Sequence, residues 1–284
     1  MRLGRLMGLG LVAAALAAGP ATAQGKKWET VRIATEGAYE PWNFTAAGGQ
    51  LQGFEIDLAN DLCRRMGVKC EISAQDWDGI IPGLQAGKYD AIMAGMSITD
   101  ERRKVIEFSS AYANAPNGLV VEKASPLARM PHTGERFDLG RDEAAALKAI
   151  EAVKPLLKGK TIGVQGSTTH ASFAEKYFKG TAEIREYKST EAHDLDLAAG
   201  RIDAILADST TLQGTLKKPE FKGYVMVGPN FNGGILGRGV GAGLRKADGE
   251  LKGLFDKAVA EAIADGTVKR LSEKWFGLDI TPRG

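Results

Sequence analysis

The sequence predicts an α/β protein of two lobes, in which each lobe has a mainly parallel sheet flanked by helices. Strand and helix patterns alternate between residues 31 and 102, and the alternation starts again at residue 161. Such alternation is typical of parallel sheets, because each helix returns the chain to the same end of the sheet. Extended stretches at residues 113–121 and 234–246 would carry the chain between the lobes, with a cleft between them.

The N-terminal segment has the pattern of a secretory signal peptide. Arg2 and Arg5 precede an apolar run over residues 6–18, and Ala21-Thr22-Ala23 supplies a cleavage site of the A-x-A type. The run is too short for a comfortable membrane span. We therefore expect residues 1–23 to be removed and the mature chain to be a soluble, exported protein.

The net charge and the cysteine content exclude several classes of function. Removing Arg2 and Arg5 takes the formal charge of +2 to near zero, and no long basic tract remains, so nucleic-acid or anionic-membrane binding is not expected. The only cysteines, Cys63 and Cys70, favour a disulfide over a metal site, because no further Cys or His nearby completes a ligand set. Closing so small a loop would stabilise the fold by about 2.5 kcal/mol, as a local link.

The first run begins with a strand over residues 31–34, and the loop after it holds Glu36, Tyr39 and Trp42. An acid and two aromatic residues at the carboxyl edge of a sheet are what a binding cleft needs. The alternative is that the aromatic residues fill the core and Glu36 is solvated.

Two helices and a strand follow in this first series of elements. Residues 58–66 follow the i, i+3, i+4 pattern of an amphipathic helix, and a strand follows over residues 68–73. Asp78 is the expected N-cap of a helix that ends at Gly87, and Trp77 lies just before that cap.

The stretch after residue 90 combines a strand over residues 91–93, a turn of small residues and a helix start that holds Asp100, Glu101 and Arg102. Helical side chains lean toward the helix N-terminus, so Arg102 could reach over the loop and meet a carboxylate there. Alternatively, it pairs with Asp100 or Glu101 on the surface. The first-lobe loops thus collect Glu36, Tyr39, Trp77, Ser97 and Arg102.

Residues 124–158 are polar and contain three prolines, so we expect a surface excursion with one alanine-rich helical patch near residues 141–153. The remaining elements are strands at 161–164, 184–187 and 204–208 and helices at 171–178, 191–199, 250–264 and 268–276. The last two helices would cover the first lobe. We expect lobe 1 to comprise residues 24–113 and 237–284, and lobe 2 residues 114–236.

The second-lobe loops present Ser167, Thr168, Thr169, His170 and Asp208. A glycine followed by hydroxyl residues at a helix start can offer N–H and hydroxyl groups to an anion, or it can be an ordinary helix cap. Asp208 can likewise cap the next helix or face a ligand ammonium. Nucleotide, zinc and hydrolase motifs are incomplete and the three histidines lie far apart, so we expect no cofactor and no metal.

Five segments together carry a family resemblance: GFEIDLANDLCRRMGVKCEI, QDWDGIIPGL, DAIMAGMSITDERR, GVQGSTTH and GVGAGLRK. They resemble the polar amino-acid class of periplasmic solute-binding proteins of ABC importers, and most of all its lysine/arginine/ornithine-, histidine- and octopine-binding branch. The resemblance implies the two-lobed type II fold and a disulfide between Cys63 and Cys70. It also implies a monomer that delivers a small amino acid or opine to an inner-membrane ABC permease.

The resemblance also implies roles for single residues. Arg102, Ser167 and Thr168 would hold the ligand α-carboxylate, and Asp208 with Ser97 would hold the α-ammonium. Tyr39 and Trp77 would sandwich the side chain of a basic amino acid, and Glu36 would face its cationic tip.

This chain departs from those relatives at several wall positions, namely Ala94 and Gly95, where serines are common, and Thr169 and His170. Loss of the serine side chains would widen the pocket and remove possible donors. An arginine-derived opine such as octopine or nopaline is the alternative ligand. The long segment 124–158 also resembles the opine-binding relatives. A dehydratase on the same fold is the enzymatic alternative, with His170 or Glu36 as its only acid; we expect no enzyme.

Overall fold

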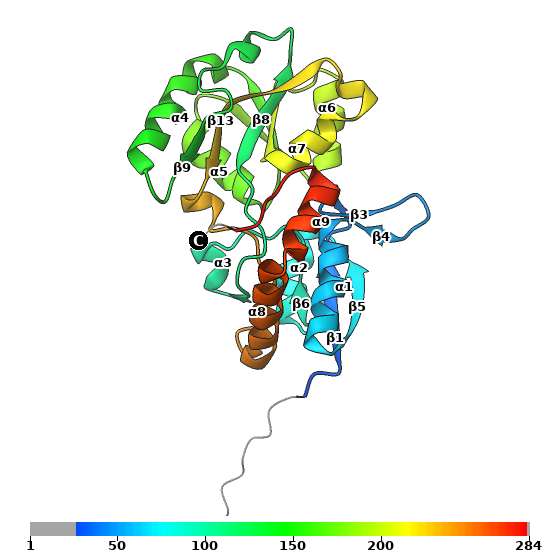
Figure 1. The fold of residues 1–284 in the computed structure, drawn as a ribbon. Helices are drawn as coiled ribbons and strands as arrows, with labels where there is room; N and C mark the ends of the chain where they lie inside the picture. Colours follow the sequence, from blue (N-terminus) through cyan, green and yellow to red (C-terminus); the bar gives the residue numbers. More distant parts are fainter. Residues whose placement is uncertain (1–26, 283–284) are drawn as a thin grey trace, which may run out of the picture.

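The computed structural model describes residues 27–282 and contains two α/β lobes, one above the other in Figure 1. The lower sheet consists of β1 (Thr30–Thr35), β5 (Lys69–Ala74), β6 (Ala91–Ile92), β7 (Glu107–Phe108) and β14 (Gly243–Leu244). Its order is β5-β1-β6-β14-β7, with β1 parallel to β5 and β6, and β14 antiparallel to both of its neighbours. A small sheet of β2 (Ala38–Tyr39), β3 (Asn43–Thr45) and β4 (Leu51–Gln52) projects from its edge.

Three long helices cover the lower sheet: α1 (Phe54–Met66), α8 (Gly249–Ala264) and α9 (Thr267–Phe276). Leu58 and Leu62 of α1 share one buried core with Phe255 of α8, as the apolar periodicity predicts. Gly67 ends α1 in the left-handed conformation, where its N–H bonds to the last carbonyls.

The expected cap at Asp78 is wrong. A 3₁₀ turn, Trp77–Gly79, runs directly into α2 (Ile80–Gln85), so Asp78 already lies inside helical backbone and cannot adopt the extended conformation of an N-cap. The short helix α3 (Asp100–Arg103) does have a cap, because Thr99 accepts a hydrogen bond from the Arg102 N–H.

The upper sheet consists of β8 (Asn117–Glu122), β9 (Arg136–Asp138), β10 (Thr161–Gln165), β11 (Glu183–Tyr187), β12 (Ala204–Asp208) and β13 (Tyr224–Asn232). Its order is β11-β10-β12-β8-β13-β9, with β10 parallel to β11 and β12, and β8 antiparallel to β12 and β13. Its helices are α4 (Glu143–Leu157), α5 (Thr169–Phe178), α6 (Thr190–Ala198) and α7 (Ser209–Leu216), with 3₁₀ turns at Pro126–Arg129, Pro219–Phe221 and Gly234–Leu236. None of the described helices could span a bilayer.

The expectation of a surface excursion over residues 124–158 is wrong. Helix α4 buries Ala146, Ile150, Val153 and Leu157 in the core of the upper lobe, and β9 pairs with β13 at the edge of the sheet. The alanines and branched residues recur at helical spacing, so their apolar stripe outweighs the polar surroundings.

The chain crosses between the lobes twice, from β7 to β8 and from the turn Gly234–Leu236 to β14. The two crossings pair, since the Tyr112 N–H donates to Val240 O at 2.9 Å and the Val240 N–H to Ala113 O at 2.8 Å. The C-terminal segment joins them, where the Asn114 N–H donates to Ile280 O at 2.8 Å. Residues 117–121, expected in the first crossing, lie instead in β8. We propose these crossings as the hinge between the two predicted lobes.

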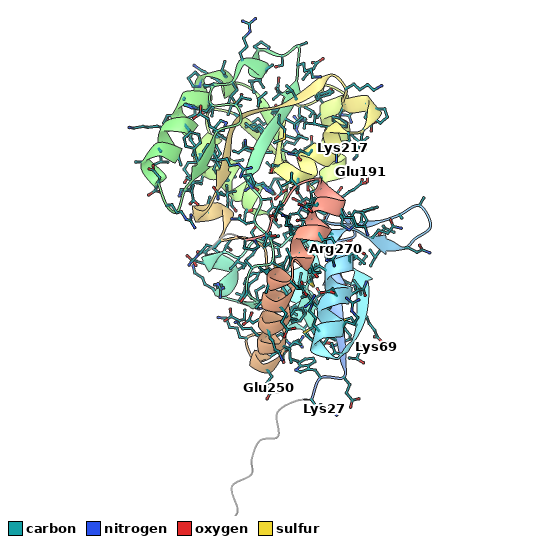
Figure 2. The ribbon with its side chains drawn as sticks, viewed as in Figure 1. Lys27, Lys69, Glu191, Lys217, Glu250 and Arg270 are labelled. Carbon is teal, nitrogen blue, oxygen red and sulfur yellow. A yellow bond between two sulfur atoms is a disulfide. The ribbon has the colours of Figure 1, made fainter. Side chains whose placement is uncertain are left out.

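Charged side chains spread over the outside of both lobes, as Figure 2 shows for Lys69, Glu250 and Lys217. Residues 1–26, which hold the predicted signal peptide, lie outside the described part of the chain.

Candidate functional site

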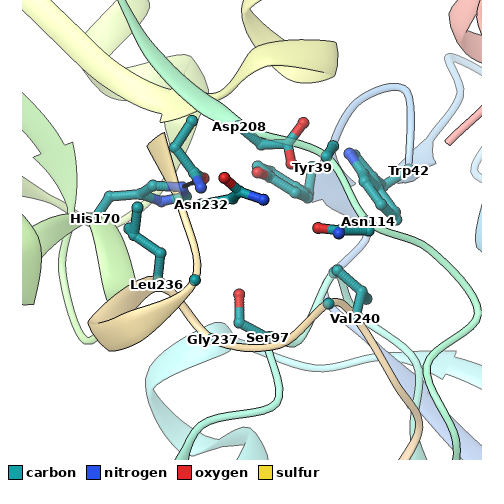
Figure 3. Close-up of a pocket in the computed structure, with 15 residues that line it drawn as sticks. Tyr39, Trp42, Ser97, Asn114, His170, Asp208, Asn232, Leu236, Gly237 and Val240 are labelled. Atoms are coloured by element: carbon teal, nitrogen blue, oxygen red, sulfur yellow. Dashed lines mark hydrogen bonds between the residues drawn. The ribbon is translucent and has the colours of Figure 1, made fainter. Parts of the chain in front are cut away.

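The lobes meet at a cleft at the carboxyl ends of β1, β6, β10 and β12, as expected for open α/β sheets. A cavity of about 20 Å³ is lined by most of the predicted site residues: Glu36, Tyr39, Trp77, Ala94, Gly95, Ser97, Arg102, Thr168, Thr169 and His170. A neighbouring cavity of about 30 Å³ is lined by Asp208 and shares Tyr39, Gly95, Ser97 and His170 with the first (Figure 3). Ser167 lines neither cavity but an outer groove beside Arg102.

Arg102 reaches back over the loop that precedes its helix. Its Nη1 donates to Ser97 O at 3.0 Å, and its guanidinium lies over the Trp77 ring, 5.2 Å from the centroid. Burial lowers the pKa of Arg102 to about 10, so desolvation is already costing its charged form free energy.

The surface-pairing alternative for Arg102 is wrong. Asp100 pairs with Arg238, and Glu101 pairs with Lys104 at 2.6 Å. Within residues 27–282, no carboxylate lies within ion-pair distance of Arg102. A desolvated guanidinium of this kind favours a bidentate anion such as a carboxylate.

The hydroxyl of Thr168 caps α5, as one of the two alternatives for this loop predicts. Its Oγ1 accepts from the Ala171 N–H at 3.1 Å and donates to Gln165 O at 2.6 Å. Ser167 has a positive φ of 58°, and its carbonyl accepts a hydrogen bond from Trp77 Nε1 at 3.3 Å across the cleft. The Thr168 side chain therefore caps the helix, while the backbone of the loop faces the first lobe.

Glu36 meets Gln165 across the cleft. Gln165 Nε2 donates to Glu36 Oε1 at 2.6 Å and to Lys188 O at 3.1 Å, which turns its carbonyl oxygen away from both partners. Burial raises the pKa of Glu36 to about 7, against the hydrogen bond from Gln165. The alternative of a solvated Glu36 is wrong, since the residue is only 9% exposed.

Asp208 caps α7, because its Oδ1 accepts from the Thr210 N–H at 2.8 Å and from the Thr210 hydroxyl. Burial raises the pKa of Asp208 to about 6. Since the bonds to Thr210 use Oδ1, capping does not exclude a second role for Oδ2. Thr210 Oγ1 also accepts from Trp42 Nε1 at 2.9 Å, which adds a third contact between the lobes.

His170 lies at the start of α5 and is held as a neutral ring. Its Nε2 lies 2.7 Å from Asn117 Oδ1, while Asn117 Nδ2 donates to Phe231 O at 3.0 Å. That second bond orients the amide, so Nε2 carries the proton. Burial lowers the pKa of His170 to about 3, which keeps the imidazole uncharged.

The position of the Tyr39 ring explains why residue 95 is a glycine. With φ at +60°, a Cβ on Gly95 would lie 2.9 Å from the Tyr39 ring, so only glycine fits without a shift. The space expected to widen the pocket is therefore filled by Tyr39, which stacks on Trp42.

Several wall residues were missed by the sequence analysis, namely Asn114, Asn117, Gln165, Asn232 and Leu236. Trp42 lines the cleft and is also fully buried in the first-lobe core. Gln165 ends a correctly predicted strand at the correct edge, and that polar strand end was the available signal. No group of three or more His, Cys, Asp or Glu side chains in the described part of the chain could hold a metal. The predicted disulfide between Cys63 and Cys70 is confirmed and links α1 to β5, away from the cleft.

Two α/β lobes, paired crossings and a polar cleft between the lobes define a two-lobed solute-binding protein of type II. The chain belongs to family 3 of the bacterial extracellular solute-binding proteins, which matches residues 31–278.

Known proteins of this kind resemble the chain over nearly its whole length. The octopine-binding periplasmic protein of Rhizobium meliloti is 47% identical, over 98% of this chain and 99% of that protein. The lysine/arginine/ornithine-binding periplasmic protein of Escherichia coli (strain K12) is 36% identical, over 99% and 97%. A solved structure of an ancestral arginine-binding protein bound to arginine has a TM-score of 0.73 at 33% identity, covering 87% of this chain and 98% of that one.

Proposed function

We propose that the chain binds a basic L-amino acid, such as arginine, lysine, ornithine or histidine, in the cleft between its lobes. One observation carries this proposal: the same cleft is lined by Arg102, which has no carboxylate partner among residues 27–282, and by the buried acid Glu36. A zwitterion with a cationic tail needs an anion-binding end and an acid at the other end, because unpaired buried charges are costly.

The remaining wall residues fit the same ligand. Arg102 and the α5 start would hold the α-carboxylate, while Asp208 and Ser97 would hold the α-ammonium. Glu36 would accept from the guanidinium or ammonium tip, while the hydrogen bond from Gln165 Nε2 holds its carboxylate in place. Trp77 and Tyr39 supply aromatic faces for the cation, a contact worth about 0.5 to 2 kcal/mol.

An arginine-derived opine such as octopine is the second candidate, favoured by the octopine-binding relative. An opine carries a carboxyalkyl group on its α-nitrogen. That group would extend from the Asp208 end into the neighbouring cavity, where Asn117, Asn232 and His170 supply uncharged polar groups.

We further propose that residues 1–23 direct export to the periplasm, where the monomer would pass its ligand to an inner-membrane ABC permease. This is the task of solute-binding proteins of importers. Closure of the lobes around the ligand would present the bound form to the permease.

We propose binding and not catalysis. The enzymatic alternative is a dehydratase, in which Glu36 would be the acid, because His170 is held neutral. Incubation with prephenate or arogenate should release no phenylpyruvate or phenylalanine, and product formation abolished by Glu36→Gln would contradict the proposal.

Calorimetric titration tests the ligand class directly. Protein freed of ligand by unfolding and refolding is titrated with arginine, lysine, ornithine, histidine, octopine and nopaline, and with glutamine and glutamate as uncharged and acidic controls. We expect heat of binding with members of the basic or opine group. Binding of glutamine or glutamate alone would refute the basic-ligand assignment.

A further inference from the structure

Glu55 is a fully buried carboxylate that no ligand role above uses. It lies in the first turn of α1, is 0% exposed and has no ion-pair partner among residues 27–282. Burial raises its pKa, and hydrogen bonds from its neighbours oppose that shift. A buried acid is costly unless several donors hold it, so the position of those donors indicates what Glu55 does.

The donors come from three separate parts of the cleft and hinge. Gly95 N donates to both carboxylate oxygens, at 2.8 and 2.9 Å. Asn43 Nδ2 donates to Oε2 at 2.6 Å, and the Tyr112 hydroxyl donates to Oε1. None of these is an N–H of the helix that carries Glu55, so its role differs from that of an ordinary first-turn acid.

Each donor leads to an element of the binding cleft. Gly95 lines both cavities, and Tyr112 lies in the first crossing, where its N–H pairs with Val240 of the second. Asn43 Oδ1 accepts from the N–H of Gly37, the residue after Glu36, at 2.8 Å. One carboxylate therefore connects two of the first-lobe binding loops to the proposed hinge.

We propose that Glu55 is a positioning residue that couples the ligand-binding loops at Gly37 and Gly95 to the crossing at Tyr112, and so sets ligand affinity without touching the ligand. The proposal rests on the proposed binding function of the cleft. Groups that bond to one buried acceptor move together, because separating any of them leaves an unpaired donor.

The test separates affinity from stability with three variants. Tyr112→Phe removes only the bond to the crossing, Glu55→Gln removes the charge, and Asp57→Asn is the matched control. Asp57 lies in the same helical turn, but it bonds to Lys274 and Trp275 on the outside. Affinities for arginine and octopine are measured by calorimetry, well below the unfolding temperature of each variant.

We expect Tyr112→Phe and Glu55→Gln to weaken binding by about tenfold, while Asp57→Asn stays within about twofold. Unchanged affinity in both Glu55→Gln and Tyr112→Phe, or an equal loss in Asp57→Asn, would overturn the proposal. If Glu55→Gln does not fold, Tyr112→Phe alone decides, since it removes a single hydroxyl.

Amide hydrogen exchange needs no ligand and separates this proposal from the proposed function. In Tyr112→Phe, the Gly37 and Gly95 amides should exchange faster, by about tenfold, although neither bonds to Tyr112. Faster exchange in a protein that binds none of the ligands would refute only the proposed function. Unchanged exchange at both amides would refute the coupling.

Discussion

Glu36 and Arg102 are the residues on which ligand choice depends. Both side chains are desolvated in the cleft. Burial raises the pKa of Glu36 and lowers the pKa of Arg102, which disfavours the charged form of each. A ligand with a group of opposite charge beside each residue would stabilise the charged form of that residue and so bind more tightly.

Arginine affinity should therefore depend on pH. In the free cleft the pKa of Glu36 is about 7, and a bound cation would lower it, so binding releases a proton below that pH. The association constant should rise with pH from about 5 to about 7, by up to about tenfold per unit, and then level off. Calorimetric titration across pH checks this, and Glu36→Gln should flatten the profile except for a smaller rise below pH 6 from Asp208. A flat wild-type profile would contradict the role of Glu36.

Removing the Arg102 guanidinium should cost the ligand its carboxylate partner. Arg102→Ala should weaken binding by about 2 to 5 kcal/mol, because it leaves a buried ligand carboxylate unpaired. Arg103→Ala is the matched control on the same helix, since Arg103 pairs with Glu107 at an exposed site. Equal losses in both variants, measured by calorimetry, would show that Arg102 does not contact the ligand.

At the scale of elements, the loops between a strand and the next helix could be predicted from the sequence. The position of a strand that pairs with strands far away in the sequence could not. The loops after β1, β6 and β10 follow local apolar patterns, so Glu36, Ser97 and Thr168 could be placed at the carboxyl edges of the two sheets. Asn117 could not be placed, because β8 inserts antiparallel between β12 and β13, which sets Asn117 opposite Asp208. Strand β13 itself was missed, since Gly228 and Pro229 interrupt its pattern and its pairing shifts register there.

Helix α4 offers a direct test of the corrected core. Ile150→Ala should destabilise the protein by about 2 to 5 kcal/mol, because it removes a fully buried side chain. Leu147→Ala on the same helix should change little, because Leu147 is 37% exposed. Urea unfolding of both variants checks this. A small effect of Ile150→Ala would indicate that α4 lies on the surface, as the sequence led us to expect.

At the scale of the whole molecule, the lobes touch through first-lobe side chains that also line the cleft. Glu36 contacts Gln165, Trp77 contacts Ser167, and Trp42 contacts Thr210. Ligand recognition and lobe closure therefore share residues, and a bound ligand should stabilise the whole fold because it bridges both lobes.

Thermal unfolding of refolded, ligand-free protein is the most direct test that the cleft selects a cationic side chain. Arginine or octopine at about a thousand times its dissociation constant should stabilise the wild-type protein by about 4 kcal/mol. The same concentration should stabilise Glu36→Gln much less. Equal stabilisation of both proteins, or stabilisation of the wild type by glutamine or glutamate alone, would contradict the account.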